Sequence, residues 1–212
     1  MGTGHTSPEA FPGPLQLQGQ GKSADVLLVL CTDPVLEETL LAEFRSAPLW
    51  LWRLPGPTIP PSGSGEGEVD SLLQEALHRR GVKEIIVCGH LPSQVLRSPQ
   101  QASLPEAAAA AIDSLHRLVK QKHGRLSPSQ FHQAVVEENV LLQLANLRTY
   151  PAVLAAMAGR RVRLHGWIYD WQEEVLYVRG PGESSLLRRT RRFVAPTAGS
   201  WPYYDPCDIY LA

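Results

Sequence analysis

Three side chains of types that commonly bind metals lie at or just after the ends of apolar segments of this sequence. Cys31 ends the apolar run 24–31, Asp33 comes two residues later, and His90 follows a second apolar run, 84–88. Ligands of open α/β sheets bind at the carboxyl ends of the strands, so we expect the thiol and the imidazole to meet there. Thiolate, imidazole and carboxylate are all zinc ligands, and a catalytic zinc takes three protein ligands and leaves a fourth position open. The spacing is therefore compatible with a zinc site formed by Cys31, His90 and Asp33.

Each of these side chains also has an ordinary structural interpretation. A cysteine at a strand end is often a small buried hydrophobic residue. A histidine after a glycine, as in Gly89-His90, is often a loop residue bonded to the backbone. Asp33 stands directly before Pro34, where it can cap the N-terminus of a helix. On these residues alone, the structural interpretation is favoured over the metal site.

The segments around these residues predict strands and helices in alternation. Apolar runs over 24–31, 49–54 and 84–88 are typical of strands buried on both faces of a parallel sheet. Helical spacing over 35–44 and 69–80 places a helix between each pair of strands, and the Pro- and Gly-rich segment 55–67 predicts a loop. This order implies right-handed crossovers and a parallel sheet.

The second half of the chain predicts more helices and then a strand pair. A Ser/Glu capping box at 103–106 opens a helix that ends near 122–124, Ser127-Pro128 opens another to about 147, and a short one follows Pro151. Residues 161–171 and 174–178 predict a hairpin. The fold class is thus α/β, with a central, mostly parallel sheet flanked by helices. We expect a flexible arm over 1–22, the domain over 23–178, and an Arg-rich and then aromatic-rich extension over 179–212.

Composition narrows the functional classes. The 20 Lys and Arg nearly balance the 21 Asp and Glu, which argues against nucleic acid as a partner. The apolar stretches are far shorter than the roughly 20 residues of a membrane span. Three cysteines, Cys31, Cys88 and Cys207, do not make a disulfide framework, so we expect a reducing, cytoplasmic location. We expect Cys88, inside its strand, to serve packing.

Several motifs together resemble the β-class carbonic anhydrases. Cys31-Thr-Asp33 resembles the Cys-x-Asp-x-Arg motif of that family, and GVKEIIVCGH (81–90) resembles the start of its second metal motif, which continues as His-x-x-Cys. Further matches occur in the same order at 138–140, 146–151 and 165–170, in positions similar to the last helix and strand of the family. The resemblance covers about 24–178 and implies the β-carbonic-anhydrase fold.

The resemblance carries the functional residues over unevenly. It implies that Cys31 and His90 are zinc ligands, whereas the third ligand position of the family holds Ser93. Asp33 matches the aspartate that an arginine holds away from the metal, and the arginine position holds Val35. Without that cationic partner, Asp33 can turn onto zinc and complete a Cys/His/Asp site.

Two functional interpretations follow. The preferred one is a degenerate homologue without normal carbon dioxide hydration, in which zinc binding is weakened or absent. It would be a homodimer that acts as a binding or interaction protein. It would bind a small anion in the pocket that holds zinc in the family, or a protein partner through residues 179–212. The alternative is an active zinc lyase that converts carbon dioxide and water to bicarbonate and a proton with Cys31, His90 and Asp33. A third is a related hydrolytic lyase for another small linear molecule.

Overall fold

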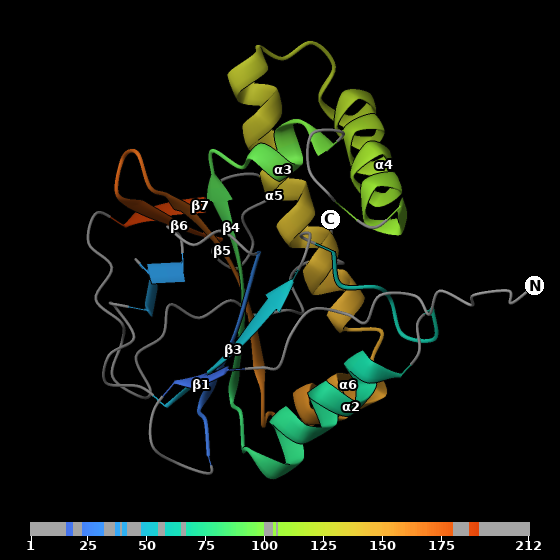
Figure 1. Ribbon diagram of the computed structural model, residues 1–212, viewed down its shortest axis with the longest axis vertical. Helices are drawn as coiled ribbons and strands as arrows, with labels where there is room; N and C mark the ends of the chain where they lie inside the picture. The colour runs from blue at the N-terminus through green and yellow to red at the C-terminus, as the bar shows by residue number, and fades with distance from the viewer. Residues whose placement is uncertain are drawn as a thin grey trace, which may run out of the picture.

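A computed structural model shows one mixed sheet with most helices on one of its faces (Figure 1). It describes residues 23–31, 37–38, 40–41, 48–54, 58–64, 67–99, 104 and 106–178, together with the backbone of 16–18, 179 and 187–190. The described residues form a seven-stranded sheet in the order β1-β3-β2-β4-β5-β6-β7. Its four central strands, β3, β2, β4 and β5, are parallel, and β1, β6 and β7 pair antiparallel at the edges.

The strands are bounded as follows: β1 Gln16–Gln18, β2 Val26–Cys31, β3 Leu49–Leu54, β4 Glu84–Leu91, β5 Arg163–Asp170, β6 Val175–Arg179 and β7 Leu187–Thr190. The helices are α2 Glu68–Gln74, α3 Gln94–Arg97, α4 Glu106–His123, α5 Pro128–Leu147 and α6 Pro151–Ala158, and a π-helical turn, η1 Glu75–Arg79, continues α2. Residues 37–38 and 40–41 are also helical. In Figure 1, α2 and α6 lie together at one end of the sheet, while α3 and α4 lie beside α5 at the other.

The central strands are buried on both faces, which explains their continuous apolar sequence. Along β2, Leu27 and Val29 enter the larger hydrophobic cluster, which includes residues of α4, α5 and α6, while Leu28 and Leu30 enter a smaller cluster on the opposite face. The alternation follows from the two-residue period of a strand. Leu40, one of the helical residues between β2 and β3, joins the smaller cluster. Helical packing thus covers the sheet on both sides of β2.

Helix α5 packs very closely on β4 and β5 because two glycines face it. A Cβ atom at Gly166 would lie 2.9 Å from Leu144 Cδ1 and 3.0 Å from Val140 Cγ1, and one at Gly89 would lie 3.0 Å from Val140 Cγ2. These distances are shorter than an ordinary carbon–carbon contact of about 3.5–4.0 Å. The absence of side chains at both glycines therefore sets how close α5 comes to the carboxyl end of β4.

The predicted fold class, α/β with a central parallel sheet flanked by helices, is confirmed. Several details differ. Strand β4 continues to Leu91, so His90 lies inside the strand rather than after it, and α3 directly beyond it was not predicted. The predicted helix over 69–80 is α-helical only to Gln74 and π-helical beyond. Strands β1 and β7 lie within the predicted arm and extension. The predicted cap at Ser103 lies outside the described residues.

A buried ionic network joins β4 to β5 at the amino ends of these strands. Glu84, 3% exposed, accepts a hydrogen bond of 2.7 Å from His165 Nε2 and bonds of 3.0 Å from Arg163 Nε. His165 is fully buried, although the sequence suggested an ordinary solvent or backbone role for it. This network lies at the opposite end of β4 from His90.

No helix in the described part of the chain combines the length and the apolar character needed to span a bilayer.

Candidate metal centre

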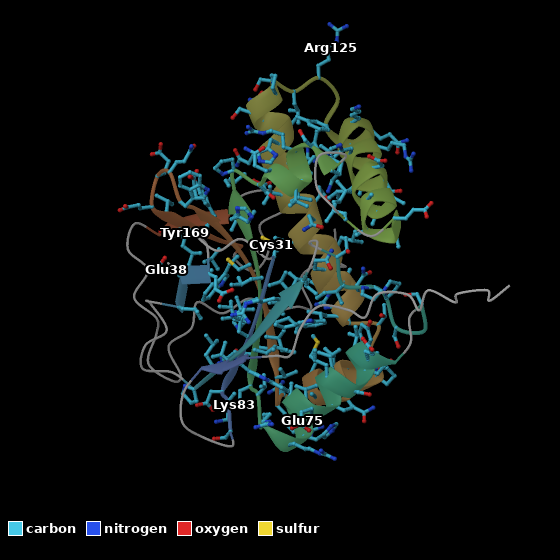
Figure 2. All side chains as sticks on the ribbon, viewed as in Figure 1. Cys31, Glu38, Glu75, Lys83, Arg125 and Tyr169 are labelled. Carbon is cyan, nitrogen blue, oxygen red and sulfur yellow. The ribbon has the colours of Figure 1, made fainter. Side chains whose placement is uncertain are left out.

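Cys31 and His90 lie on neighbouring parallel strands and line the same cavity. Cys31 is the last residue of β2, and His90 is the second-last residue of β4. The register pairs Leu30 of β2 with Cys88 of β4, so the carboxyl ends of these two strands lie side by side at this edge of the sheet. His90 is 3% exposed, and Cys31 is half-buried. Figure 2 shows Cys31 where the central strands end. The structure thus brings together two of the three predicted ligands.

The cavity that they line is small and mostly apolar. Its volume is about 20 Å³, which is enough for about one water molecule. Hydrophobic side chains form most of the wall: Val29, Leu30, Leu54, Val87, Leu96 and Val140. Ser93, Asn139 and Gln143 contribute polar groups. A cavity of this kind suits a small molecule with little polarity.

Asn139 and Gln143, one turn apart on α5, are held in fixed orientations. Gln143 Oε1 accepts a hydrogen bond from the backbone N–H of Ile59, so its Nε2 is the donor in the 3.2 Å bond to Asn139 Oδ1. Both side chains are buried. Asn139 Nδ2 has no hydrogen-bond partner among the described residues, and Asn139 lines the cavity. The network therefore leaves a fixed N–H donor available at this wall.

Ser93 lines the cavity, but its hydroxyl caps a helix. It is the N-cap of α3, and its Oγ accepts a hydrogen bond of 3.4 Å from Leu96 N. The backbone N–H of Ser93 donates to His132 Nε2 at 3.0 Å. Ser93 is 3% exposed. At the position where the resemblance expects a cysteine ligand, the serine therefore has a structural role in this chain.

We expect Ser93→Ala to lower the free energy of unfolding by about 1 kcal/mol, the usual cost of losing a serine N-cap. Denaturant unfolding at neutral pH measures this difference. Ser98→Ala is the matched control, because Ser98 lies at the other end of α3, where no helix N–H needs a side-chain cap. Equal stability of Ser93→Ala and the wild type would show that the cap is not formed.

The two cysteines beside the cavity differ in their ionisation. Cys88 is 3% exposed, and its burial raises the pKa of its thiol, an effect to which the nearby Cys31 adds. Cys88 therefore stays protonated near neutral pH and serves packing in the smaller hydrophobic cluster, as the sequence suggested. Of the two described cysteines, Cys31, at the strand end, is therefore the better candidate ligand.

Whether zinc fits this site depends on which side chains can donate to it. Within the described ranges, no three His, Cys, Asp or Glu side chains come close enough to hold a metal ion. The third predicted ligand, Asp33, lies outside the described residues, as do Val35 and Cys207. A thiolate, a buried imidazole and a carboxylate are together a chemically suitable set for catalytic zinc. The residues present therefore fit zinc when Asp33 supplies the third donor.

Asn139, Gln143 and His132 were not predicted as site residues from the sequence. All three are buried polar residues on α5, a helix whose other buried residues are mostly apolar. The i, i+4 spacing of Asn139 and Gln143 places them on one face. This spacing was the available signal, but only the packing of α5 on β4 shows that this face meets the cavity.

Comparison with known proteins identifies the family. The carbonic anhydrase family model matches residues 26–176. A carbonic anhydrase of Synechocystis is 32% identical over 164 residues, which cover 74% of this chain and 60% of that protein. One from Pseudomonas aeruginosa is 30% identical over 170 residues, covering 76% of this chain and 77% of the relative. The chain thus spans less than two thirds of the Synechocystis relative.

Solved structures agree. The β-carbonic anhydrase CcaA superposes with a TM-score of 0.65 at 28% identity, covering 74% of this chain and 80% of that one. The wild-type β-carbonic anhydrase CafD of Aspergillus fumigatus gives a TM-score of 0.61 at 21% identity, covering 79% of this chain and 99% of that one, and supports the fold alone.

These comparisons correct one prediction. The preferred interpretation, a degenerate homologue without normal carbon dioxide hydration, is wrong, because relatives 27–32% identical over most of the chain are carbonic anhydrases. That interpretation took Ser93 as a loss of function. The structure gives the serine a role as a helix cap and keeps Cys31 and His90 at one cavity. The chain belongs to the β-class carbonic anhydrase family.

Proposed function

We propose that this protein is an active zinc-dependent carbonic anhydrase, which converts carbon dioxide and water to bicarbonate and a proton. The observation that carries the proposal is the shared cavity of Cys31 and His90 at adjacent strand ends. The family match over residues 26–176 supports it.

Cys31, His90 and Asp33 are the proposed ligands of zinc. Bound zinc supplies a Lewis acid that makes water a nucleophile near neutral pH. The thiolate and the imidazole approach from β2 and β4, and the carboxylate belongs to the segment directly after β2. Burial of His90 keeps its imidazole in a fixed place and limits competition from bulk water.

The remaining walls of the cavity are proposed to receive the substrate and to orient the product. Carbon dioxide is small and carries no net charge, so the apolar side chains of Val87, Leu96 and Val140 offer it a compatible surface. Bicarbonate is an anion with oxygen acceptors. The Nδ2–H of Asn139, fixed by the bond from Gln143 to Oδ1, can donate to one of these oxygens. The cavity lining thus offers an apolar surface to the substrate, carbon dioxide, and a hydrogen-bond donor to the product, bicarbonate.

The direct test is the zinc content of the purified protein together with stopped-flow carbon dioxide hydration. We expect about one zinc per chain and rapid hydration, and a metal-free protein without hydration would overturn the proposal. Asp33→Asn should weaken zinc binding at least tenfold and reduce hydration with it, because a neutral amide is a poorer zinc ligand than a carboxylate.

Asp25→Asn is the control for Asp33→Asn. Asp25 precedes β2 at its opposite end and forms a surface ion pair of 3.0 Å with Lys83. Such exposed pairs contribute little stability. We expect Asp25→Asn to keep zinc and activity. If Asp33→Asn also keeps both, Asp33 is not a ligand.

The assembly and the further partners of the chain remain predictions. The homodimer is tested by light scattering of the purified protein, and the protein partner at 179–212 by binding of the chain with and without that segment. Among the structural neighbours, the carbonic anhydrases of Sordaria macrospora are described as tetrameric. That description applies to those proteins.

A further inference from the structure

A second, much larger cavity lies between α3, α4 and α5. Its volume is about 430 Å³, within the range of small-molecule sites. The residues that matter for its chemistry are Leu96, Arg97, His116, Phe131, His132 and Val135. It shares Leu96 with the candidate metal cavity but contains neither Cys31 nor His90. It is therefore a separate site, and the proposed reaction does not use it.

His132 places a hydrogen-bond donor at this cavity. Its Nε2 accepts the 3.0 Å bond from the backbone N–H of Ser93, so the proton of the neutral ring lies on Nδ1. Burial, with smaller effects from Arg97, His90 and His116, lowers the pKa of His132 to about 4, so the ring is neutral near pH 7. The residue is only 7% exposed, and Nδ1 has no hydrogen-bond partner among the described residues. This N–H is therefore available to donate to a ligand in the cavity.

The cavity also carries positive charge, and its described lining residues include no acid. Arg97 is exposed and forms no ion pair with any described residue. The cavity reaches the first turn of α5, a 20-residue helix that begins at Pro128, where the helix dipole favours anions. None of the described residues that line the cavity carries a carboxylate. An anionic group between Arg97 and His132 would therefore meet a cation, an N–H donor and a helix N-terminus.

The rest of the wall is apolar. Leu96 and Val135 are buried, and Phe131 is half-buried with its ring against His116, at 5.5 Å between centroids. His116 is itself fixed, because its Nε2–H donates to Leu96 O at 2.7 Å. A fully hydrated inorganic anion would leave these apolar surfaces without a contact. A ligand with an apolar body would cover them.

We propose that this cavity binds a small organic carboxylate with an apolar or aromatic body. The carboxylate lies between the Arg97 guanidinium and the His132 Nδ1–H, and the body packs on Phe131, Leu96 and Val135. Because His132 also accepts the Ser93 N–H bond, the ligand sits one hydrogen bond away from the wall of the candidate metal cavity.

Benzoate is the probe for the test, and the readout is an NMR titration of the full chain that follows the imidazole nitrogens. We expect saturable 1:1 binding with a dissociation constant of about 1 mM or tighter, and a shift of the His132 Nδ1 signal. Benzamide, which has the same body without the charge, should bind at least about tenfold more weakly, since charge-assisted hydrogen bonds are roughly twice as strong as neutral ones.

Four variants locate the binding. Arg97→Gln should weaken benzoate at least about tenfold, and Arg97→Lys should recover part of the loss because it restores the charge. Arg125→Gln is the matched control: this exposed arginine follows α4 and points away from the fold (Figure 2), and it should leave binding unchanged. Cys31→Ala should also leave it unchanged, which separates this cavity from the candidate metal centre.

The proposal is overturned by any of three results. The first is no saturable shift of His132 in the wild type. The second is equal binding by Arg97→Gln and Arg125→Gln. The third is loss of benzoate binding in Cys31→Ala, which would place the carboxylate at the metal centre instead.

Discussion

Replacing Cys31 with alanine is expected to abolish zinc binding and to lower the rate of carbon dioxide hydration by more than about 100-fold. Even changes to groups that only support a metal ligand cost about 10–100-fold in affinity or activity, so the loss of a ligand should cost more. Cys31 is the only thiolate donor that the proposed site contains, since Ser93 occupies the family position of the other cysteine. Zinc analysis and stopped-flow hydration measure the two effects.

Cys88→Ala is the matched control for Cys31→Ala. Both cysteines line the same cavity, but burial raises the pKa of Cys88 and keeps its thiol protonated. We expect this variant to keep zinc and hydration and to lose about 1 kcal/mol of stability, as for a small core truncation. If Cys88→Ala lost zinc as completely as Cys31→Ala, the assignment of Cys31 as the thiolate ligand would be wrong.

The central sheet could be predicted from the sequence because its cause is local. Runs such as 24–31 and 84–88 are apolar at nearly every position, and strands buried on both faces require that pattern. The carboxyl-end rule then placed Cys31 and His90 together without any coordinates. Both line one cavity in the structure.

The polar wall of the site could not be predicted in the same way. Asn139 and Gln143 reach the cavity because α5 packs very closely on the sheet. That close packing depends on Gly89 and Gly166, which are distant in the sequence from α5 and from each other. Such long-range packing leaves no local pattern in the sequence. The same holds for His132, whose partner Ser93 is 39 positions distant.

Ser93 shows how one position can mislead an inference from a motif. The motif comparison treats it as a missing ligand, and the degenerate interpretation followed from this together with Val35 at the arginine position. The N-terminal turn of α3, which was not predicted, needs an acceptor for its free N–H groups, and a serine supplies one. In the proposed site, Cys31, His90 and Asp33 are still enough donors for the three-ligand site of a catalytic zinc.

Glu84→Gln is expected to destabilise the fold by about 3 kcal/mol at neutral pH. Glu84 is buried and bonded to both Arg163 and His165, and breaking a buried ion pair costs about 3–5 kcal/mol. We expect the low end of that range because the Arg163 side chain is 35% exposed and can regain water. Thermal or denaturant unfolding measures the difference, and activity should follow only the fraction of folded protein, because the network lies at the far end of β4 from His90.

The pH dependence of the stability difference between the wild type and Glu84→Gln tests whether the difference comes from the charge of Glu84. Burial alone would raise the pKa of Glu84, but the hydrogen bonds from His165 and Arg163 and their charges outweigh it, so the pKa lies below the usual 4.5. A carboxyl group whose pKa is lowered by folding stabilises the fold above its unfolded pKa, and this contribution is lost as the pH falls through the folded value. The stability gap between wild type and Glu84→Gln should therefore be widest at neutral pH and narrow below about pH 4.5.

Glu75→Gln is the comparison that separates this network from ordinary surface charge. Glu75 pairs with Arg79 at 3.2 Å and with Arg80 at 2.9 Å, and its side chain is 26% exposed, against 4% for Glu84. Partly exposed pairs of this kind contribute at most about 1 kcal/mol. A loss in Glu84→Gln no larger than in Glu75→Gln, or a gap that does not change with acid, would mean that the β4–β5 network does not hold the amino ends of the strands together. A large, acid-sensitive gap would show that an ionic network holds β4 and β5 together at the end of the sheet opposite the proposed metal site.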